Sequence, residues 1–201
     1  MQKSIIFSLF LICSIGLNAQ TDQKIYDIID AVSAERIKND VKTLADFGTR
    51  HTLSDTVSQT RGIGAARRWI KSEFEKINSS CNDCLNVFYQ KDLVEKDGSR
   101  IVHDVEIVNV LAIQKGTKYP NRYIIMSGDI DSRVSDPTDF TSDSPGANDN
   151  ASGMAGTIEA ARVLSNYKFE SSIIYVGLSG EEQGLYGGKG LAAYAKEKGW
   201  E

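Results

Sequence analysis

Five carboxylates stand at positions in the sequence where chemistry is expected. Asp129 and Asp131 directly follow one extended apolar segment, and their spacing of two places them on the same side of an extended chain. Asp149 stands at the start of an expected helix, and Glu181 and Glu182 follow a second apolar segment. Carboxylates that converge repel one another, so they stay ionised at neutral pH only beside positive charge. No run of Lys or Arg stands nearby, and a bound divalent cation would supply that charge.

Each of these acids also has a purely structural interpretation. Asp129 and Asp149 are of a residue type that turns and helix caps favour, and the glutamate pair is compatible with a solvated helix entry. The common position of the acids favours the metal site, because three separate segments bring them to one edge of a predicted sheet.

The segments around these acids alternate between extended and helical patterns. Residues 122–126 and 171–178 are expected strands, and residues 153–165 and 186–198 are expected helices. This alternation is typical of parallel strands joined by crossover helices. Ligands of such sheets bind beyond the carboxyl ends of the strands, which is where the acids stand.

The first half of the chain predicts helices followed by a hairpin. Apolar residues recur three or four apart over residues 24–47, which predicts one helix or two short ones, and again over residues 60–77. Residues 85–94 and 101–114 are rich in Val, Ile, Phe and Tyr and flank a turn at residues 96–99, which predicts an antiparallel hairpin. The predicted fold class is α/β, a three-layer α/β/α arrangement with a mixed, mainly parallel sheet.

Four short motifs resemble one enzyme family. They lie at residues 46–51, 129–132, 145–153 and 180–188. They are similar to segments of the secreted zinc-dependent metallo-aminopeptidases of the aminopeptidase Y and bacterial leucyl aminopeptidase type, whose two-zinc site uses HxDS, PGADDNASG and EExGLxGS. The resemblance implies a zinc exopeptidase-like fold and an exopeptidase that holds two zinc ions.

The resemblance also implies a role for each acid. Asp149 resembles the carboxylate that bridges the two metals, and Glu182 resembles a terminal metal ligand. Glu181 resembles the general base, and Asp131 the catalytic-site carboxylate that orients a ligand. The Asp149–Asn150 peptide matches a position where family members carry a cis bond.

One residue departs from the family pattern. Asp129 stands where the family has its first histidine ligand. An anionic oxygen donor in place of a neutral imidazole shifts the preference of a site toward harder cations, so manganese or another divalent ion becomes a candidate beside zinc.

The resemblance further implies ligands that this sequence does not contain. The sequence ends at Glu201, where the pattern calls for another parallel strand, and family members carry a further aspartate and histidine ligand from there on. The two histidines present are His51, expected to pack or hydrogen-bond inside the fold, and His103, expected to be exposed in a strand. We therefore expect the sequence to be an N-terminal portion of a longer protein, and the fold to be incomplete.

Composition and the first residues narrow the class of protein. The 201 residues carry a formal charge of -4, which gives no positive field for nucleic acid. Residues 1–19 predict a signal peptide that is cleaved before Gln20, and a lipoprotein signal at Cys13 is disfavoured by the bulky residues before it. The protein is then exported, to the periplasm or the medium, without a stable membrane anchor, and Cys81 and Cys84 are expected to form a local disulfide.

The predicted organisation is a signal peptide at 1–19, a helical segment at 20–84 and the N-terminal part of a metallopeptidase α/β domain at 85–201. The predicted function is a metal-dependent aminopeptidase that hydrolyses peptide bonds at free N-termini. Two alternatives remain, which are a glutaminyl cyclase-like enzyme and an inactive peptidase-fold binding module.

Overall fold

A computed structural model describes residues 22–201, which divide into two units, one ending at Ala31 and one from Val32 to Glu201. The first unit contains helix α1 (Gln23–Asp30), which Asp22 caps by accepting a hydrogen bond from the backbone N–H of Lys24. The expected signal peptide at residues 1–19 lies outside the described residues. None of the helices within residues 22–201 is long and apolar enough to cross a membrane.

The second unit begins with two helices, α2 (Ala34–Asp46) and α3 (Gly62–Ser80). The periodic stretch at residues 24–47 is two helices because Ser33 starts a new one, accepting a hydrogen bond from the backbone N–H of Arg36. The apolar face predicted for α3 is buried; it consists of Ile63, Ala66, Ile70, Phe74 and Ile77. The expected disulfide between Cys81 and Cys84 follows directly after α3.

The four strands are β1 (Leu85–Val94), β2 (Val105–Gln114), β3 (Tyr119–Asp129) and β4 (Ser171–Leu178), in the sheet order β1-β2-β4-β3. β1 and β2 form the predicted antiparallel hairpin, and β3 and β4 form the predicted parallel pair. The mixed sheet is thus confirmed. Its predominantly parallel character is not found within residues 22–201, because β4 inserts between β2 and β3 and runs antiparallel to β2.

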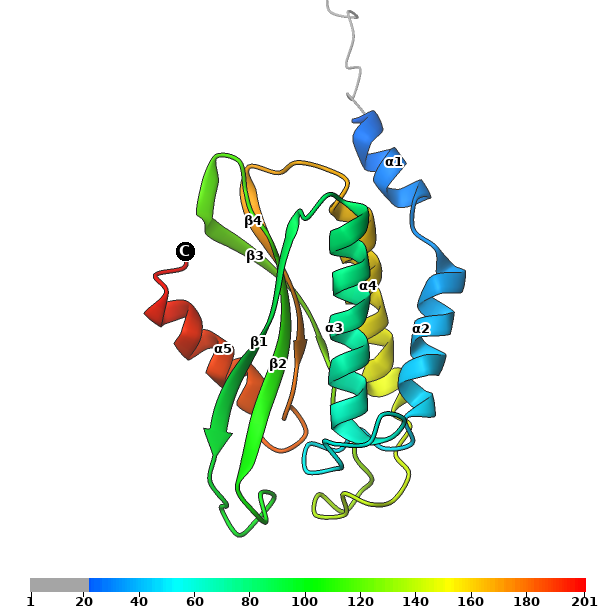
Figure 1. Ribbon diagram of the computed structural model, residues 1–201, viewed down its shortest axis with the longest axis vertical. Helices are drawn as coiled ribbons and strands as arrows, with labels where there is room; N and C mark the ends of the chain where they lie inside the picture. The colour runs from blue at the N-terminus through cyan, green and yellow to red at the C-terminus, as the bar shows by residue number, and fades with distance from the viewer. Residues whose placement is uncertain (1–21) are drawn as a thin grey trace, which may run out of the picture. The chain divides into compact units, whose positions relative to one another are not determined.

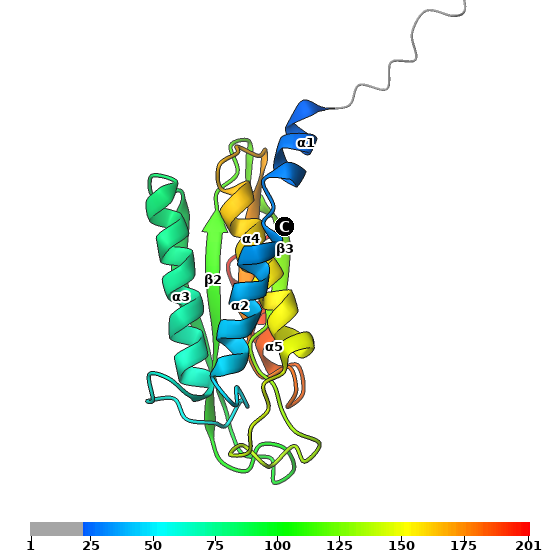
Figure 2. The same cartoon turned by 90° about the vertical axis from the view of Figure 1, so that its right-hand side faces the viewer.

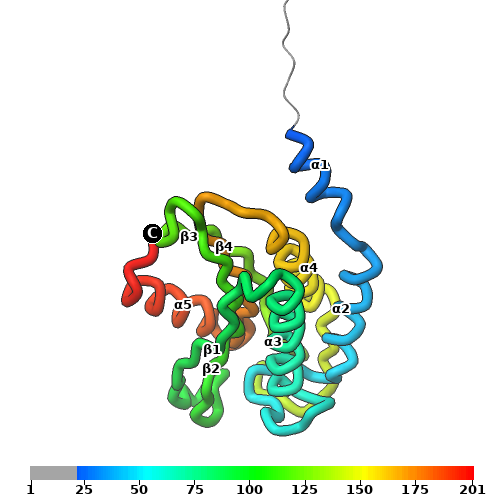
Figure 3. The backbone as a smooth tube through the Cα atoms, turned by 45° about the horizontal axis from the view of Figure 1, so that its top comes forward, coloured from blue at the N-terminus to red at the C-terminus, as the bar shows by residue number. Residues whose placement is uncertain are grey.

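Helices cover both faces of the sheet, which confirms the three layers (Figures 1 and 2). α2, α3 and α4 (Ser152–Leu164) lie on one face, and α5 (Tyr186–Glu197) lies on the other. Figure 3 shows α5 on the side of the sheet away from α2, α3 and α4. The main core fills the space under α2, α3 and α4 and includes Leu44, Ile70, Phe74, Met154 and Tyr175. Burial of these apolar side chains is the dominant stabilising term of the arrangement.

The β1–β2 connection corrects one expectation. β2 begins at Val105 rather than at residue 101, so His103 lies in the connection and not in a strand. Asp97 closes a turn there, because its carboxylate accepts the backbone N–H groups of Ser99 and Ile101. His103 is exposed, as expected.

The parallel pairing of β3 and β4 positions the site. Asp129 is paired in register with Leu178, and the backbone N–H of Ile130 donates to the carbonyl of Leu178 at 2.7 Å. Both strands therefore end together. The connections after α2 and after β3 gather at the same end of the sheet (Figure 1), where Thr49 and Ser144 form a parallel bridge.

Candidate active site

Asp131 organises the acids at the ends of β3 and β4. It is 1% exposed, and its carboxylate accepts the backbone N–H groups of Glu181 and Glu182, both at 3.1 Å, and the hydroxyl of Thr52 at 2.8 Å. Burial raises the pKa of the Asp131 carboxyl, and these hydrogen bonds oppose that shift. Asp131 thus holds the backbone of the glutamate pair in place.

Asp129 and Glu181 experience the crowding of acids that the sequence predicted. Burial, and then the charge of Asp131, raise the pKa of Asp129 to about 6, and Asp149 and Glu182 add to that shift. Burial and the charge of Asp129 raise the pKa of Glu181 as well. The structure therefore brings all five predicted acids into one electrostatic neighbourhood, where an added cation is favoured.

Asp149 reaches this neighbourhood from the turn before α4. The turn spans Ala147–Ala151 and departs from helical geometry at Asp149 (φ -116°, ψ 101°) and Asn150 (φ -129°, ψ 40°). Its Asp149–Asn150 bond is cis, as the resemblance implied. Gly146 enters the turn at a φ of 44°, where a Cβ would lie 2.5 Å from the carbonyl oxygen of Asp149. The side-chain amide of Asn150 donates to Asp129 at 3.3 Å, which links the turn to the end of β3.

Arg133 is a site residue that the sequence reasoning missed. Its Nε donates to Oε2 of Glu182 at 2.7 Å, and its Nη1 donates to the carbonyls of Val134 and Ser135. Positive charge therefore already stands beside one carboxylate, although no run of Lys or Arg marks it. The available signal was position, because Arg133 follows Asp131 by two residues in the same strand-end segment.

Arg50 is a second missed residue, and it holds the turn that carries Asp149. Its guanidinium is 1% exposed and donates to the carbonyls of Ile130 at 2.8 Å, Leu44 at 2.9 Å, Pro145 at 2.7 Å and Gly146 at 3.0 Å. Burial lowers its pKa to about 10. The signal was the motif at residues 46–51, which contains Arg50 and whose role the sequence did not define.

His51 has the packing and hydrogen-bonding role expected of it. It is fully buried, and its Nδ1 accepts the backbone N–H of Leu53 at 3.0 Å. Its Nε2 lies 3.0 Å from the carbonyl oxygen of Pro137 and 2.7 Å from the side-chain amide nitrogen of Gln183. Burial lowers the pKa of His51, which keeps the ring neutral. His51 therefore holds the loop that contains Pro137, and both of its ring nitrogens have partners, so neither is free for a metal.

Known proteins match the part of the chain that contains the five acids. The model of peptidase family M28 matches residues 109–200. A probable zinc metalloprotease of Pyrenophora teres f. teres is 47% identical over 175 residues, which cover 87% of this chain and 36% of that protein. Residues 109–200 belong to peptidase family M28. The chain spans about a third of the length of this curated relative, so further parts of that protein have no counterpart in the 201 residues.

Two solved structures share the M28 fold. A glutaminyl cyclase of Fimbriiglobus ruber superposes with a TM-score of 0.63 at 21% identity, over 84% of this chain and 57% of that chain. A leucine aminopeptidase precursor of Bacteroides thetaiotaomicron superposes with a TM-score of 0.56 at 23% identity, over 75% of this chain and 48% of that one. Their names give different activities, so the shared fold does not choose between them.

The similarity to probable zinc metalloproteases implies zinc. The carboxylate oxygens at this edge fit a divalent cation, because their like negative charges repel one another and a cation would relieve that repulsion. Within residues 22–201, however, no three His, Cys, Asp or Glu side chains lie close enough to hold a metal ion. The expectation that Asp129, Asp149 and Glu182 share the reach of one ion therefore stays a prediction. Arg133 occupies an oxygen of Glu182, and Asn150 contacts an oxygen of Asp129. Their roles as ligands stay a prediction.

The raised pKa of Asp129 gives a pH dependence of stability. Because the folded-state pKa of about 6 exceeds the ordinary value of 3.8, this carboxyl favours folding most below pH 3.8, and that contribution is lost as the pH rises toward 6. In metal-free protein, Asp129→Asn should therefore increase the free energy of unfolding by about 1–2 kcal/mol at about pH 7.5, after allowance for screening, and by almost nothing at about pH 4. Urea unfolding at both pH values measures this. An equal effect at the two pH values would show that Asp129 is not destabilised by neighbouring charge.

The ion pair between Arg133 and Glu182 predicts a change in metal affinity. Arg133→Met should raise the affinity for Zn²⁺ and Mn²⁺ by about tenfold, because one carboxylate loses its competing cation. Arg100→Met is the matched control, since Arg100 donates to the backbone carbonyl of Glu182 and not to its carboxylate. Calorimetric titration compares the three proteins. Equal affinities for wild type and Arg133→Met would mean that the ion pair does not compete with metal.

Proposed function

We propose that this chain belongs to an exported, zinc-dependent M28 aminopeptidase. The observation that carries the proposal is the attachment of Glu181 and Glu182 to buried Asp131. That attachment places two adjacent glutamates, with different surroundings, at the edge where Asp129 and Asp149 converge. Two carboxylates in different surroundings can divide the work of proton transfer and of ligation.

Glu181 is the general base in this proposal. Its pKa is raised by burial and by the charge of Asp129, which moves the carboxylate toward the basicity that a proton acceptor needs at neutral pH. Its backbone is held by Asp131, so its position does not depend on its own charge state. A bound zinc would supply an activated water and polarise the peptide carbonyl.

Asp129, Asp149 and Glu182 are the residues that would hold the metal. Each offers a carboxylate from a different segment, and the segments are joined by the Asn150 contact to Asp129 and by Asp131. Asp129 makes manganese a candidate alongside zinc, because it is a harder donor than the histidine it replaces. Two ions are expected from the resemblance.

Peptides with a free N-terminus are the proposed substrates. The motifs at residues 129–132, 145–153 and 180–188 support an aminopeptidase, and the glutamate pair in the last motif supports hydrolysis over glutaminyl cyclisation. Cyclisation remains the second candidate, because a glutaminyl cyclase shares this fold. An inactive binding module is the third, and it would hold peptide without turnover.

Export is part of the proposal and rests on two features. The sequence before Gln20 has the pattern of a signal peptide. The Cys81–Cys84 disulfide supports it, since such bonds persist in oxidising compartments. Fractionation of cells that make the protein, with amino-terminal sequencing of the exported form, tests the proposal; an intact residue 1 in the cytosol would contradict it.

Product analysis separates the three candidate functions. The protein should release the first amino acid from leucyl peptides, lose that activity after treatment with 1,10-phenanthroline, and regain it with Zn²⁺ or Mn²⁺. Acetylated peptides are the control and should stay intact. Pyroglutamate formation from glutaminyl peptides would instead identify a cyclase, and metal binding without any turnover would identify the binding module.

A further inference from the structure

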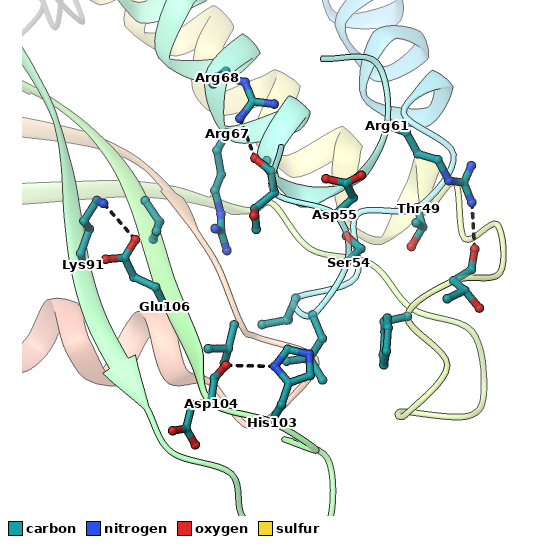
Figure 4. A pocket seen from close by; sticks show the side chains of 18 of the residues that line it. Thr49, Ser54, Asp55, Arg61, Arg67, Arg68, Lys91, His103, Asp104 and Glu106 are labelled. Atoms are coloured by element: carbon teal, nitrogen blue, oxygen red, sulfur yellow. Dashed lines mark hydrogen bonds and ion pairs between the residues drawn. The ribbon is translucent and has the colours of Figure 1, made fainter. Parts of the chain in front are cut away.

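A large cavity lies away from the five carboxylates. It has a volume of about 980 Å³ and opens between the start of α3, the β1–β2 hairpin and the loops that contain Ser54 and Phe140 (Figure 4). None of the five acids at the strand ends lines it. A volume of this size accommodates a small organic molecule or the end of a peptide.

Arg67 is the unusual residue of this cavity. It is 6% exposed, and Figure 4 shows its side chain extending from α3 into the space beside β2. Its Nη2 donates to the hydroxyl of Ser179 at 3.0 Å, while its buried Nε has no hydrogen-bond partner within residues 22–201. A buried cation that leaves a donor unused costs free energy, which an anionic partner would recover.

The other cationic side chains of the cavity have more partners than Arg67 has, although Nε of Arg68 is also buried without a hydrogen-bond partner within residues 22–201. Lys91 is paired with Glu106 at 2.9 Å, and Arg68 donates to backbone carbonyls, including that of Thr56 at 2.8 Å. Arg61 is paired with Asp143 at 2.6 Å. Arg67 is thus the one guanidinium among these cavity residues, all within the described chain, whose hydrogen bonds to other residues are limited to a single neutral hydroxyl.

The lining indicates the class of anion. Four cationic side chains and three acidic ones face the cavity, which suits a single negative charge better than the double charge of phosphate. Leu53, Val105, Val108 and Phe140 add an apolar wall. A planar carboxylate matches the fork of a guanidinium, and an apolar body matches the wall.

We propose that this cavity binds a monocarboxylate with an apolar body, and that Arg67 binds its carboxylate. The cavity is not lined by the five acids of the proposed catalytic edge, but two of its lining residues donate hydrogen bonds to residues at that edge. Arg67 donates to Ser179, two residues before Glu181, and Thr52, which also lines the cavity, donates to Asp131. Binding of a carboxylate at Arg67 should therefore change the environment of the loop that carries Glu181 and Glu182.

The binding experiment uses phenylacetate as the probe and phenylacetamide as its neutral control. In protein freed of metal with 1,10-phenanthroline, phenylacetate should shift the NMR signals of the Arg67 guanidinium and of the Ser179 and Glu181 backbone amides with saturation. Phenylacetamide should give none of these shifts, because it lacks the charge that Arg67 requires. Since metal and turnover are absent, the result does not depend on the proposed peptidase function.

Variants locate the binding. Arg67→Lys keeps the charge but loses the fork, so its affinity for phenylacetate should fall about tenfold. Arg61→Lys is the matched control, because Arg61 lines the same cavity but already has an acidic partner. If Arg67→Lys does not fold, the NMR shifts of the Arg67 guanidinium in the wild-type protein show whether phenylacetate binds there. Equal binding of the amide, unchanged affinity in Arg67→Lys, tighter binding of inorganic phosphate, or no saturable shift would each overturn the proposal.

Two further probes identify the source of the carboxylate. Acetyl-glycyl-phenylalanine carries a peptide C-terminus but has a blocked N-terminus. If it binds more tightly than phenylacetate, peptide ends are the ligand; if phenylacetate binds more tightly, free organic acids are. Either outcome supports a carboxylate site at Arg67, and failure of both to bind contradicts it.

Discussion

Glu181→Gln is expected to lower peptide hydrolysis by about 10²–10⁴-fold while leaving metal affinity nearly unchanged, because the amide keeps the shape of the side chain but cannot accept a proton. The backbone N–H of residue 181 would still donate to Asp131, so the loop should keep its position. The variant also removes a carboxylate whose pKa is raised by burial and by the charges of Asp129 and Asp131. Its stability without metal should therefore not fall.

Glu182→Gln is the matched variant, since it makes the same chemical change one residue away. It should lower the bound metal per protein, because Glu182 is the proposed ligand, and it should also weaken the pair with Arg133. Metal content by mass spectrometry and turnover of a leucyl peptide, measured on both variants, separate ligation from proton transfer. Equal metal loss in the two variants would contradict the division of roles.

The elements of the fold were predictable because their signals are local. The period of apolar residues marks α3, and the alternation of strand and helix after Pro120 marks β3, α4, β4 and α5. The strand order is not a local property. β4 pairs with β2 as well as with β3, and this insertion depends on contacts between segments about sixty residues apart.

The acids of the site were predictable for a related reason, and their partners were not. A carboxylate at the end of a predicted strand has a predictable place, because parallel strands end at one edge. Arg133 and Asn150 contact those carboxylates from loops whose course the sequence does not define. The hydrogen bonds that these two side chains donate to Glu182 and Asp129 could therefore not be predicted from the sequence.

Arg50→Met is expected to lower the free energy of unfolding by about 3 kcal/mol or more, among the larger effects of a single substitution. The variant removes a buried guanidinium whose donors reach the carbonyls of Ile130, Leu44, Pro145 and Gly146. Methionine fills part of the space but offers no donor. Each buried carbonyl left without a partner costs about 1–3 kcal/mol, and relaxation of the loop recovers part of the sum.

Urea unfolding of metal-free protein measures this loss, and Arg122→Met is the control. Arg122 has an exposed side chain and a long contact of 3.8 Å to Glu201, so its replacement should change stability by less than about 0.5 kcal/mol. A loss below about 1 kcal/mol for Arg50→Met would mean that water reaches those carbonyls in the variant. Since Pro145 and Gly146 lead into the turn that carries Asp149, the same variant should also weaken metal binding, and it should do so even at temperatures where the protein remains folded.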